Sequence, residues 1–294
     1  MATNKPHVIV ARQALNLDEL AEVRWLQDVC NAYDGLDLKL SVAVPRQSVD
    51  ERGEGANQFR AYLTGVLVGY CSLDVGGSVE VCGMVHPVVR REGIGRKLLA
   101  AATQECRRQG VRRVLLICED ASRAGKAFVT AAGARWEFAE HRMELDASRR
   151  VPVSGASGQS IVLRRAGPED VGTLARVQAG VFGDPEDAAR RSIQEDVAAE
   201  DRFYLGLLGD EPVSSLKVIF VDSRAAIYAF GVLPQYRGRG LGRQMFVRLF
   251  ETLRPEGWMR FMLEVEPDNA AALALYQGLG FRMTTTYGYY QLDL

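Results

Sequence analysis

The sequence has few of the residues on which several classes of protein depend. The second half contains no cysteine, and the five cysteines of the first half, at positions 30, 71, 82, 106 and 118, form no CxxC pair. An odd number of cysteines in apolar surroundings is typical of buried free thiols in a reducing compartment. With only three histidines in addition, we expect neither a disulfide framework, nor a metal site, nor a catalytic cysteine.

Long apolar runs and a strong net charge are also missing. No stretch of about 18 apolar residues is present to span a bilayer, and the opening residues, MATNKPHVIV, lack the apolar core of a secretion signal. The formal net charge is −1, so no overall field draws the chain to nucleic acid or to an anionic membrane. We therefore expect a cytoplasmic protein that binds neither.

What the sequence does contain is an internal repeat. Residues 85–96 read VHPVVRREGIGR, and residues 232–243 read VLPQYRGRGLGR. Gly93 and Gly240 within them lie 147 positions apart, and this spacing holds without gaps from about residue 87 to residue 146. The chain has 294 residues, 47% of them hydrophobic, so each copy is long enough to bury its own core.

The repeat divides the chain into two domains, which we predict at residues 1–146 and 161–294. Residues 147–160 are rich in Ser and Gly and have no apolar period, which is typical of a linker. Periodicity and turn residues predict the order β-α-α-β-β-β-α-β-α-β in the second copy, and the first copy fits the same order. We expect an α/β (α+β) fold in which each domain has a mixed, mostly antiparallel sheet flanked by helices.

Each copy has a glycine-rich loop between a predicted strand and a predicted helix. The loop reads RGRGLG at residues 237–242 and RREGIG at residues 90–95. Glycines let backbone amides approach an anion closely, and the helix N-terminus adds the positive end of its dipole. Arg237, Arg239 and Arg243 add charge that suits phosphate oxygens. Neither loop has the spacing GxxxxGK[ST] or GxGxxG, so we predict another cofactor that carries a pyrophosphate.

The pattern Arg-x-x-Gly-x-Gly at this place resembles the acetyl-CoA pyrophosphate loop of the GNAT superfamily of acetyltransferases. The second copy resembles that family further along, at LEVEPDN (263–269) and ALYQGLGF (274–281). The resemblance covers nearly all of residues 161–294 and, less fully, the first copy from about residue 59. It implies two tandem GNAT domains that use acetyl-CoA as co-substrate and acetylate the primary amine of a small molecule or peptide.

Two alternatives to this function stay open. A pair of such domains in about 300 residues also resembles the layout of the mycothiol synthases, which implies acylation of a thiol-sugar amine. A non-catalytic acyl-CoA-binding module is the other alternative. Because the tandem already supplies an internal pair of domains, a monomer and a homodimer are both compatible with it.

Direct acetyl transfer to an amine requires a base for the amine, a stabilised carbonyl oxygen and a proton for the departing thiolate. The resemblance implies that Tyr276 is the general acid, since a phenol can donate a proton to a thiolate. Glu264, twelve residues earlier, is the candidate general base and would act through a water molecule. The alternative interpretations are a core tyrosine for Tyr276 and a salt-bridge partner for Glu264.

The cofactor-binding residues that the resemblance implies lie at a strand end, in the glycine loop and at the start of a later helix. They are Val232, Leu233, Arg237, Gly238, Arg239, Gly240, Leu241, Gly242, Arg243 and Asn269. The strand end would receive the pantetheine arm as an added strand. Asn269 would hydrogen-bond that arm, and its position also suits a helix N-cap.

The ungapped register allows the first copy to be compared residue by residue. The counterparts of Glu264, Asn269 and Tyr276 are, in that order, Ile117, Ser122 and Val129. We therefore predict that the first domain is catalytically degenerate. Its retained residues form a second candidate cofactor site that comprises Val85, Arg90, Gly93, Gly95 and Arg96.

Overall fold

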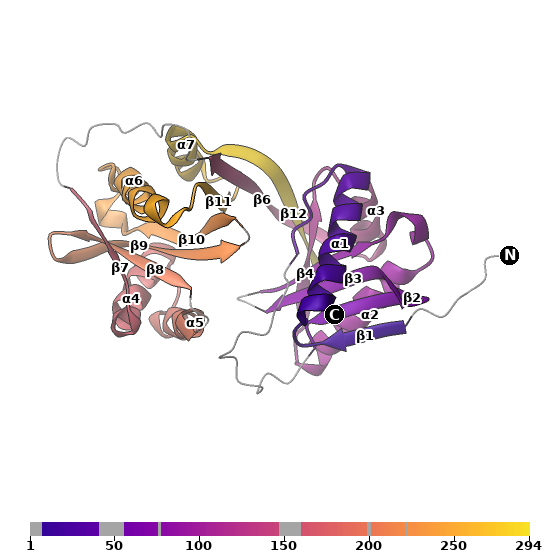
Figure 1. The fold of residues 1–294 in the computed structure, drawn as a ribbon. Coiled ribbons are helices and arrows are strands. Elements are labelled where there is room, and N and C mark those ends of the chain that lie inside the picture. The colour runs from indigo at the N-terminus through magenta and orange to yellow at the C-terminus, as the bar shows by residue number, and fades with distance from the viewer. Residues whose placement is uncertain (1–7, 41–55, 76–77, 147–159, 199–200, 222) are drawn as a thin grey trace. The chain divides into compact units, whose positions relative to one another are not determined.

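A computed structural model describes residues 8–40, 56–75, 78–146, 160–198, 201–221 and 223–294. The chain divides into two compact units (Figure 1). Unit 1 comprises Met1–Ala139 and Thr285–Leu294, and unit 2 comprises Glu140–Thr284. The predicted linker, residues 147–160, lies outside the described residues except for its last position.

The first repeat contains both strands and helices, with three strands in succession after its first helix. Its elements are β1 (Val8–Arg12), α1 (Leu17–Asp34), β2 (Gln58–Leu63), β3 (Val66–Val75), β4 (Val79–Val85), α2 (Ile94–Arg108), β5 (Arg113–Glu119), α3 (Arg123–Ala131) and β6 (Arg135–Asp146). Between β1 and β2 the described residues contain only α1, while residues 41–55 lie outside them.

The second repeat has the predicted order of elements. They are β7 (Val162–Arg165), α4 (Val171–Phe182), α5 (Glu186–Ala198), β8 (Arg202–Leu208), β9 (Glu211–Val221), β10 (Arg224–Val232), α6 (Leu241–Leu253), β11 (Arg260–Val265), α7 (Ala270–Leu279) and β12 (Arg282–Asp293). The expected α/β class, with helices flanking a mixed and mostly antiparallel sheet, is confirmed.

Local signals explain where several helices begin and end. The side chain of Asn16 accepts a hydrogen bond from the amide of Glu19, and the Glu19 carboxylate accepts one from the amide of Asn16, so a capping box starts α1. Gly35 (φ +67°) ends α1, and Gly183 (φ +83°) ends α4. Glycine adopts this left-handed conformation without steric cost, which lets the chain leave each helix sharply.

The last strand of each repeat belongs to the unit that the other repeat mainly builds. In unit 1 the strand order is β1-β2-β3-β4-β5-β12, and in unit 2 it is β6-β11-β10-β9-β8-β7. β12 pairs antiparallel with β5, which places Tyr289 opposite Ile117, and β6 pairs antiparallel with β11, which places Arg142 opposite Glu264.

The compact units therefore differ from the predicted domains, 1–146 and 161–294, by an exchange of strands. β6 and β12 are 12 residues long, whereas β5 and β11 have 7 and 6 residues. A strand this long has residues left over after it has paired with β5 or β11, so it is divided between the two units. The unpaired edges of β5 and β11 are covered in this way, which removes two sites of unwanted strand addition.

Helices cover both faces of the sheet in unit 2. Figure 1 shows α6 on one side of β9 and β10, and α4 and α5 on the other. The face under α6 and α7 holds an aromatic core that includes Phe246, Phe250, Phe261, Tyr276 and Phe281. The face under α4 and α5 holds a smaller cluster that includes Leu174, Val177, Ile193, Phe203 and Leu205. Each fully buried side chain of this size stabilises the fold by about 1.5–3 kcal/mol, which makes these faces rigid supports.

Unit 1 has the same two-faced construction. One core lies against α2 and includes Ile94, Leu98, Val114 and Leu116. The other lies against α1 and includes Val23, Leu26, Tyr70 and Met84. All five cysteines are free and buried, as the sequence predicts.

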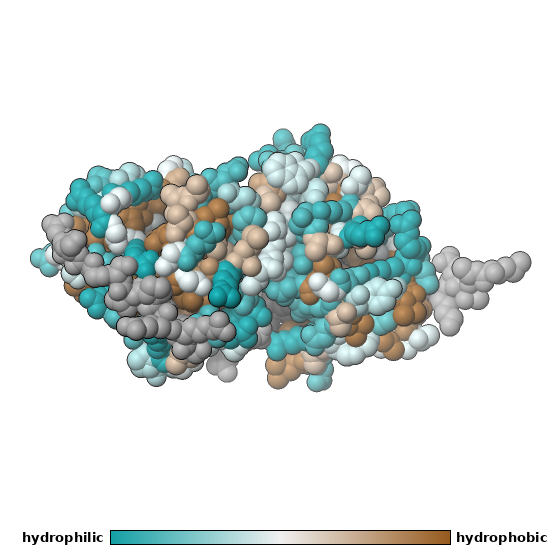
Figure 2. All heavy atoms as spheres, turned by 90° about the horizontal axis from the view of Figure 1, so that it is seen from above, coloured by the Kyte–Doolittle hydropathy of each residue, from teal (hydrophilic) through white to brown (hydrophobic). Residues whose placement is uncertain are grey.

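The surface carries no large apolar region in the view of Figure 2. Hydrophilic residues predominate there, and the hydrophobic residues form small separate groups, which is usual for folded proteins. No helix in the described part of the chain is long and apolar enough to cross a bilayer.

Candidate active site

The glycine loop of the second repeat presents backbone amides at the start of α6. Gly238 (φ +76°) and Gly240 (φ +72°) are both left-handed, so a side chain at either position would be strained. The first helical hydrogen bond runs from the amide of Gln244 to the carbonyl of Gly240 (3.2 Å). The three amides between them precede that bond and point out of the helix end, where the dipole also favours an anion.

Arg237 holds this loop in place. Its Nε donates to the carbonyl of Val232 at 2.9 Å, and its terminal nitrogen donates to the carbonyl of Val181 on α4 at 3.2 Å. The loop is thereby joined to the end of β10 and to the end of α4. Arg237, which we predicted to contact a phosphate, thus uses part of its hydrogen-bonding capacity within the protein.

The other two arginines also contact the protein. Arg239 donates to the carbonyl of Gln235 at 3.0 Å and lies 5.3 Å from the ring centre of Tyr236. Arg243 donates to the carbonyl of Gly278 at the end of α7, at 3.0 Å. Both guanidinium groups flank the loop, so they keep a positive potential beside its amides. This combination of amides and arginines suits the pyrophosphate of a coenzyme.

β10 and β11 separate beyond their last shared pair. The two strands pair in parallel from Arg224 and Arg260 as far as Ile227 and Leu263, and no later pair is formed among the described residues. A bulge in β10 follows at once: its register against β9 shifts between residues 228 and 231, and Ala229 has a φ of +47°. A bulge bends its strand, and here it accompanies the separation of β10 from β11.

The end of β10 turns one backbone amide away from its partner strand. The amide of Leu233 donates to the carbonyl of Val213 on β9 at 2.9 Å. Successive amides of an extended strand point to opposite edges, so the amide of Val232 points away from β9, to the side where β11 has separated. An extended ligand could pair with this edge, and the contact of a pantetheine arm with Val232 and Leu233 stays a prediction.

Glu264 and Tyr276 lie on opposite faces of the sheet of unit 2. Glu264 is the first residue of β11 beyond the last pair with β10. Its neighbours Leu263 and Val265 point into the core under α6 and α7, and Tyr276 belongs to the same core. Side chains alternate along a strand, so Glu264 points to the other face. A reacting group held between the separated strands would have one candidate on each side.

Tyr276 is a core tyrosine as well as the candidate acid. Its side chain is 7% exposed, and its ring packs edge-on against Phe246 and Phe281, with centroids 5.5 and 6.0 Å away. Burial raises the pKa of the phenol to about 12, because the phenolate would lose its hydration. The group is therefore protonated at neutral pH, as a proton donor must be.

Glu264 is held by an arginine that sequence reasoning missed. The terminal nitrogen of Arg142 lies 3.3 Å from its carboxylate, and the two side chains are 9% and 7% exposed. Arg142 stands on β6, in the first repeat, 122 positions from its partner. In the sequence Arg142 stands between His141 and Met143, and this local pattern does not identify its partner.

Asn269 is the N-cap of α7. Its side-chain oxygen accepts a hydrogen bond from the amide of Ala272 at 3.1 Å, so the N-cap interpretation is correct. The side chain is exposed, and its NH2 group is available to a ligand, so the cap leaves the predicted contact with pantetheine open.

The glycine loop of unit 1 keeps the same backbone shape with different residues. Gly93 has a φ of +83°, and Arg91, the counterpart of Gly238, has a φ of +70°. A non-glycine residue in this region costs roughly 1–2 kcal/mol. Arg90 donates through Nε to the carbonyl of Val85 at 3.0 Å and pairs with Asp34 at 2.6 Å. The contact that anchors the loop to the preceding strand is thus present in both repeats, and in unit 1 the loop also contains a strained residue.

The rest of the site is not repeated in unit 1. β4 pairs with β3 without a register shift, so the bulge of β10 has no counterpart. Ile117 takes the place of Glu264, and Tyr289 faces it where Arg142 would stand. The hydroxyl of Tyr289 accepts a hydrogen bond from Lys39 at 2.7 Å, and the hydroxyl of Tyr287 donates to the carbonyl of Asp37 at 2.5 Å.

The segment after α1 therefore lies across this face of unit 1. The amide of Asp37 also donates to the buried carboxylate of Glu119 at 2.8 Å, two residues beyond Ile117 on the same face of β5. Three hydrogen bonds thus hold residues 37–39 over the position where unit 2 has its candidate base. This segment therefore occupies part of the face on which an acceptor would have to lie in unit 1.

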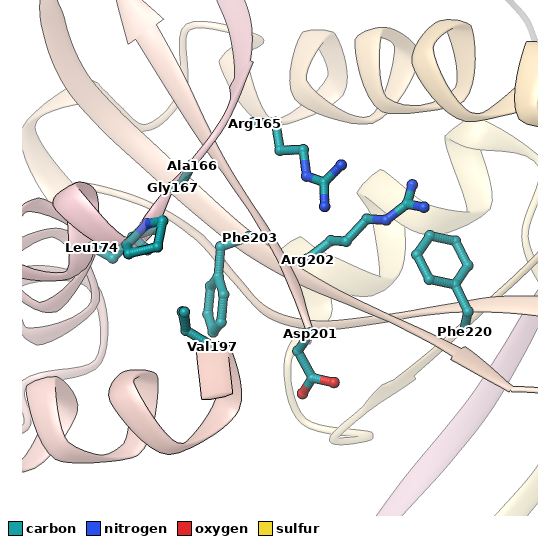
Figure 3. A pocket seen from close by; sticks show the side chains of 10 residues that line it. Arg165, Ala166, Gly167, Leu174, Val197, Asp201, Arg202, Phe203 and Phe220 are labelled. Carbon is teal, nitrogen blue, oxygen red and sulfur yellow. The ribbon is translucent and has the colours of Figure 1, made fainter. Parts of the chain in front are cut away.

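A pocket of about 490 Å³ lies elsewhere in unit 2 (Figure 3). Arg165 at the end of β7, Arg202 at the start of β8 and Phe220 on β9 are among its lining residues. Arg202 extends towards Phe220, 4.5 Å from the ring centre. Phe220 pairs with Ala225 near the start of β10, so the pocket is at the opposite end of the strands from the glycine loop. No group of His, Cys, Asp and Glu suited to a metal occurs among the described residues.

Known proteins resemble this chain in both repeats. A family profile described as "Acetyltransferase (GNAT) family" matches residues 21–133 and 173–281. A mycothiol acetyltransferase of Thermomonospora curvata is 30% identical over 286 residues, which cover 93% of this chain and 93% of that protein. A mycothiol acetyltransferase of Rhodococcus erythropolis is 30% identical over 251 residues, which cover 78% of this chain and 82% of that protein.

Solved structures also resemble the whole chain. A tandem GNAT protein from the clavulanic acid biosynthesis pathway matches with a TM-score of 0.70 and 19% sequence identity, and the match covers 98% of each chain. At this level of identity the likeness shows the fold alone, and the fold it shows includes the tandem arrangement.

Proposed function

The chain belongs to the GNAT family of acetyltransferases, and on that premise we propose that unit 2 transfers an acetyl group from acetyl-CoA to the primary amine of a small molecule or peptide. One observation carries the proposal. The strands β10 and β11 separate just before Glu264, Tyr276 lies in the core on the opposite face of the sheet, and the amides at the start of α6 suit a pyrophosphate.

The residues divide the work of the reaction between them. Glu264 takes a proton from the attacking amine through a water molecule, which makes its lone pair available. The amide of Val232 donates a hydrogen bond to the thioester oxygen, where negative charge develops during attack. Tyr276 gives its proton to the sulfur of the departing thiolate. Acetyl-CoA supplies the activated acyl group, and the loop at residues 238–243 holds its pyrophosphate.

The first test is a calorimetric titration of acetyl-CoA into the full chain, combined with thiol release in the presence of primary amines. We expect binding that is lost in Gly240→Val, because valine cannot adopt a φ of +72° without distorting the loop. Gly257→Val is the matched control, since Gly257 is also left-handed (φ +93°) but lies beyond the far end of α6. A chain that binds no acetyl-CoA would disprove the proposed function.

A second candidate acceptor is favoured by the relatives. Proteins named mycothiol acetyltransferase are 30% identical to this chain and match most of its length, which supports a thiol-sugar amine as acceptor. A conjugate of an amino sugar with a thiol amino acid should then have a kcat/KM at least tenfold above that of simple amines. Equal kcat/KM values for the conjugate and for simple amines would favour a general amine acetyltransferase instead.

A further inference from the structure

We propose that Arg142, contributed by the first repeat, is a positioning residue for acetyl transfer in unit 2. It acts by holding the carboxylate of Glu264 in a fixed position next to the point where β10 and β11 separate. This inference rests on the proposed function and assigns a catalytic purpose to the exchange of the last strands.

The contact between the two residues is specific. The pairing of β6 with β11 places them directly opposite each other, and the guanidinium of Arg142 lies 3.3 Å from the carboxylate of Glu264. Both side chains are less than a tenth exposed. Another pair that includes an arginine of β6, Arg135 with Asp293, is 72% and 62% exposed. The pair of Arg142 and Glu264 is therefore shielded from water, whereas the pair of Arg135 and Asp293 is not.

Burial makes each member of the pair depend on the other. A buried carboxylate is costly to keep in the fold unless a compensating charge lies beside it. The guanidinium that supplies this charge also restricts where the carboxylate oxygens can lie. Arginine is the suitable partner because its guanidinium remains charged in any protein environment. Loss of Arg142 should therefore disable Glu264 without touching the glycine loop.

The comparison between the units supports a role in catalysis. In unit 1 the same two register positions hold Tyr289 and Ile117, so the charged pair is absent there together with the tyrosine of α7, whose counterpart is Val129. If the pair served only to join β6 to β11, its counterpart would be equally useful between β12 and β5. The charged pair occurs in the unit that also has the candidate acid, and the first repeat supplies the arginine of that pair.

The experiment is a double-mutant cycle in the full chain with Arg142→Met, Glu264→Gln and the combined variant, measured as kcat and as KM for acetyl-CoA. We expect Arg142→Met to lower kcat at least tenfold, with KM for acetyl-CoA unchanged within twofold. In the Glu264→Gln background the same change should lower kcat less than twofold, because Arg142 acts through the carboxylate. Arg142→Lys should retain more activity than Arg142→Met, since the positive charge remains.

Controls separate this proposal from a structural role and from failure of the proposed function. Arg135→Met removes an arginine from the same strand and should leave kcat unchanged. Equal losses from Arg142→Met with and without Glu264 would overturn the proposal. If Arg142→Met alone does not fold, two other comparisons test the proposal. One is Glu264→Gln against the combined variant, and the other is Arg142→Lys against the natural chain. Absence of acetyl transfer in the natural chain would instead overturn the proposed function.

Discussion

At the scale of single residues, the chemistry depends on what burial does to two side chains. Tyr276 lies in an aromatic core, where loss of hydration raises the pKa of its phenol to about 12. Glu264 faces away from that core and is paired with an arginine. The two candidate side chains therefore have different surroundings on the two faces of one sheet, an aromatic core around Tyr276 and an arginine beside Glu264.

Replacement of Tyr276 by phenylalanine tests the acid. The ring and its packing against Phe246 are retained, so we expect the thermal midpoint to change little. The rate should fall about 10²-fold, the lower end of what a positioned acid contributes. Steady-state thiol release is the measurement, with Tyr204→Phe, another tyrosine buried in this unit, as the control. Full activity in Tyr276→Phe would remove Tyr276 from the mechanism.

The pH dependence of stability follows from the same burial. A phenol whose pKa is raised from its ordinary value of 10.0 to about 12 in the folded protein favours the folded state while it is protonated. That contribution is complete below about pH 10 and is lost as the pH rises through about 12. In urea titrations between pH 9 and 12, the natural chain should therefore lose more stability than Tyr276→Phe. Parallel curves for the two proteins would contradict this assignment.

At the scale of elements, the two glycine loops show how one backbone shape survives a change of residue. Arg91 adopts a φ of +70° where the second loop has Gly238. The contact from Arg90 to the end of β4 matches the contact from Arg237 to the end of β10. These side-chain anchors hold the loop strongly enough to tolerate one strained residue.

Exchange of these residues should have opposite effects in the two loops. Arg91→Gly relieves a left-handed side chain, so we expect the free energy of unfolding to rise by about 1 kcal/mol. Gly238→Arg introduces the same strain in the other loop and should lower it by a similar amount. Chemical denaturation of the two variants and the natural chain provides the values. An equal change of the same sign in both variants would show that strain is not the cause.

At the scale of the whole molecule, neither repeat completes its own sheet. Residues 287–293 of the second repeat pair with β5, and residues 141–146 of the first pair with β11. Tyr290 and Leu292 of β12 also pack against the core under α2. The folding of unit 1 should therefore depend on the last residues of the chain.

Removal of residues 285–294 tests this dependence. The amides of β5 that now pair with β12 would lose their partners, so hydrogen exchange in residues 113–119 should accelerate at least tenfold. Residues 260–265 pair with β10 and β6, which the truncation leaves in place, and serve as the internal control. Unchanged protection of residues 113–119 would show that β5 does not require β12.

What the sequence by itself determined is local or repeated along the chain. The repeat of 147 positions, the two loops, the order of elements in the second repeat and the absence of Glu264 and Tyr276 counterparts in the first all follow from residue types at fixed spacings. Turns, caps and periodicity act over a few residues, so they can be read without knowledge of the fold.

What only the tertiary structure decided is which distant strands become neighbours. The periodicity of β6 shows which residues share a face, but an alternating strand can pair with β5 or with β11 equally well by that criterion. The partner of Glu264, the arrangement of residues 37–39 over Ile117 and the strand composition of each unit depend on that choice. They were decided by pairing and burial between residues 82 or more positions apart, where no short pattern can specify the partner.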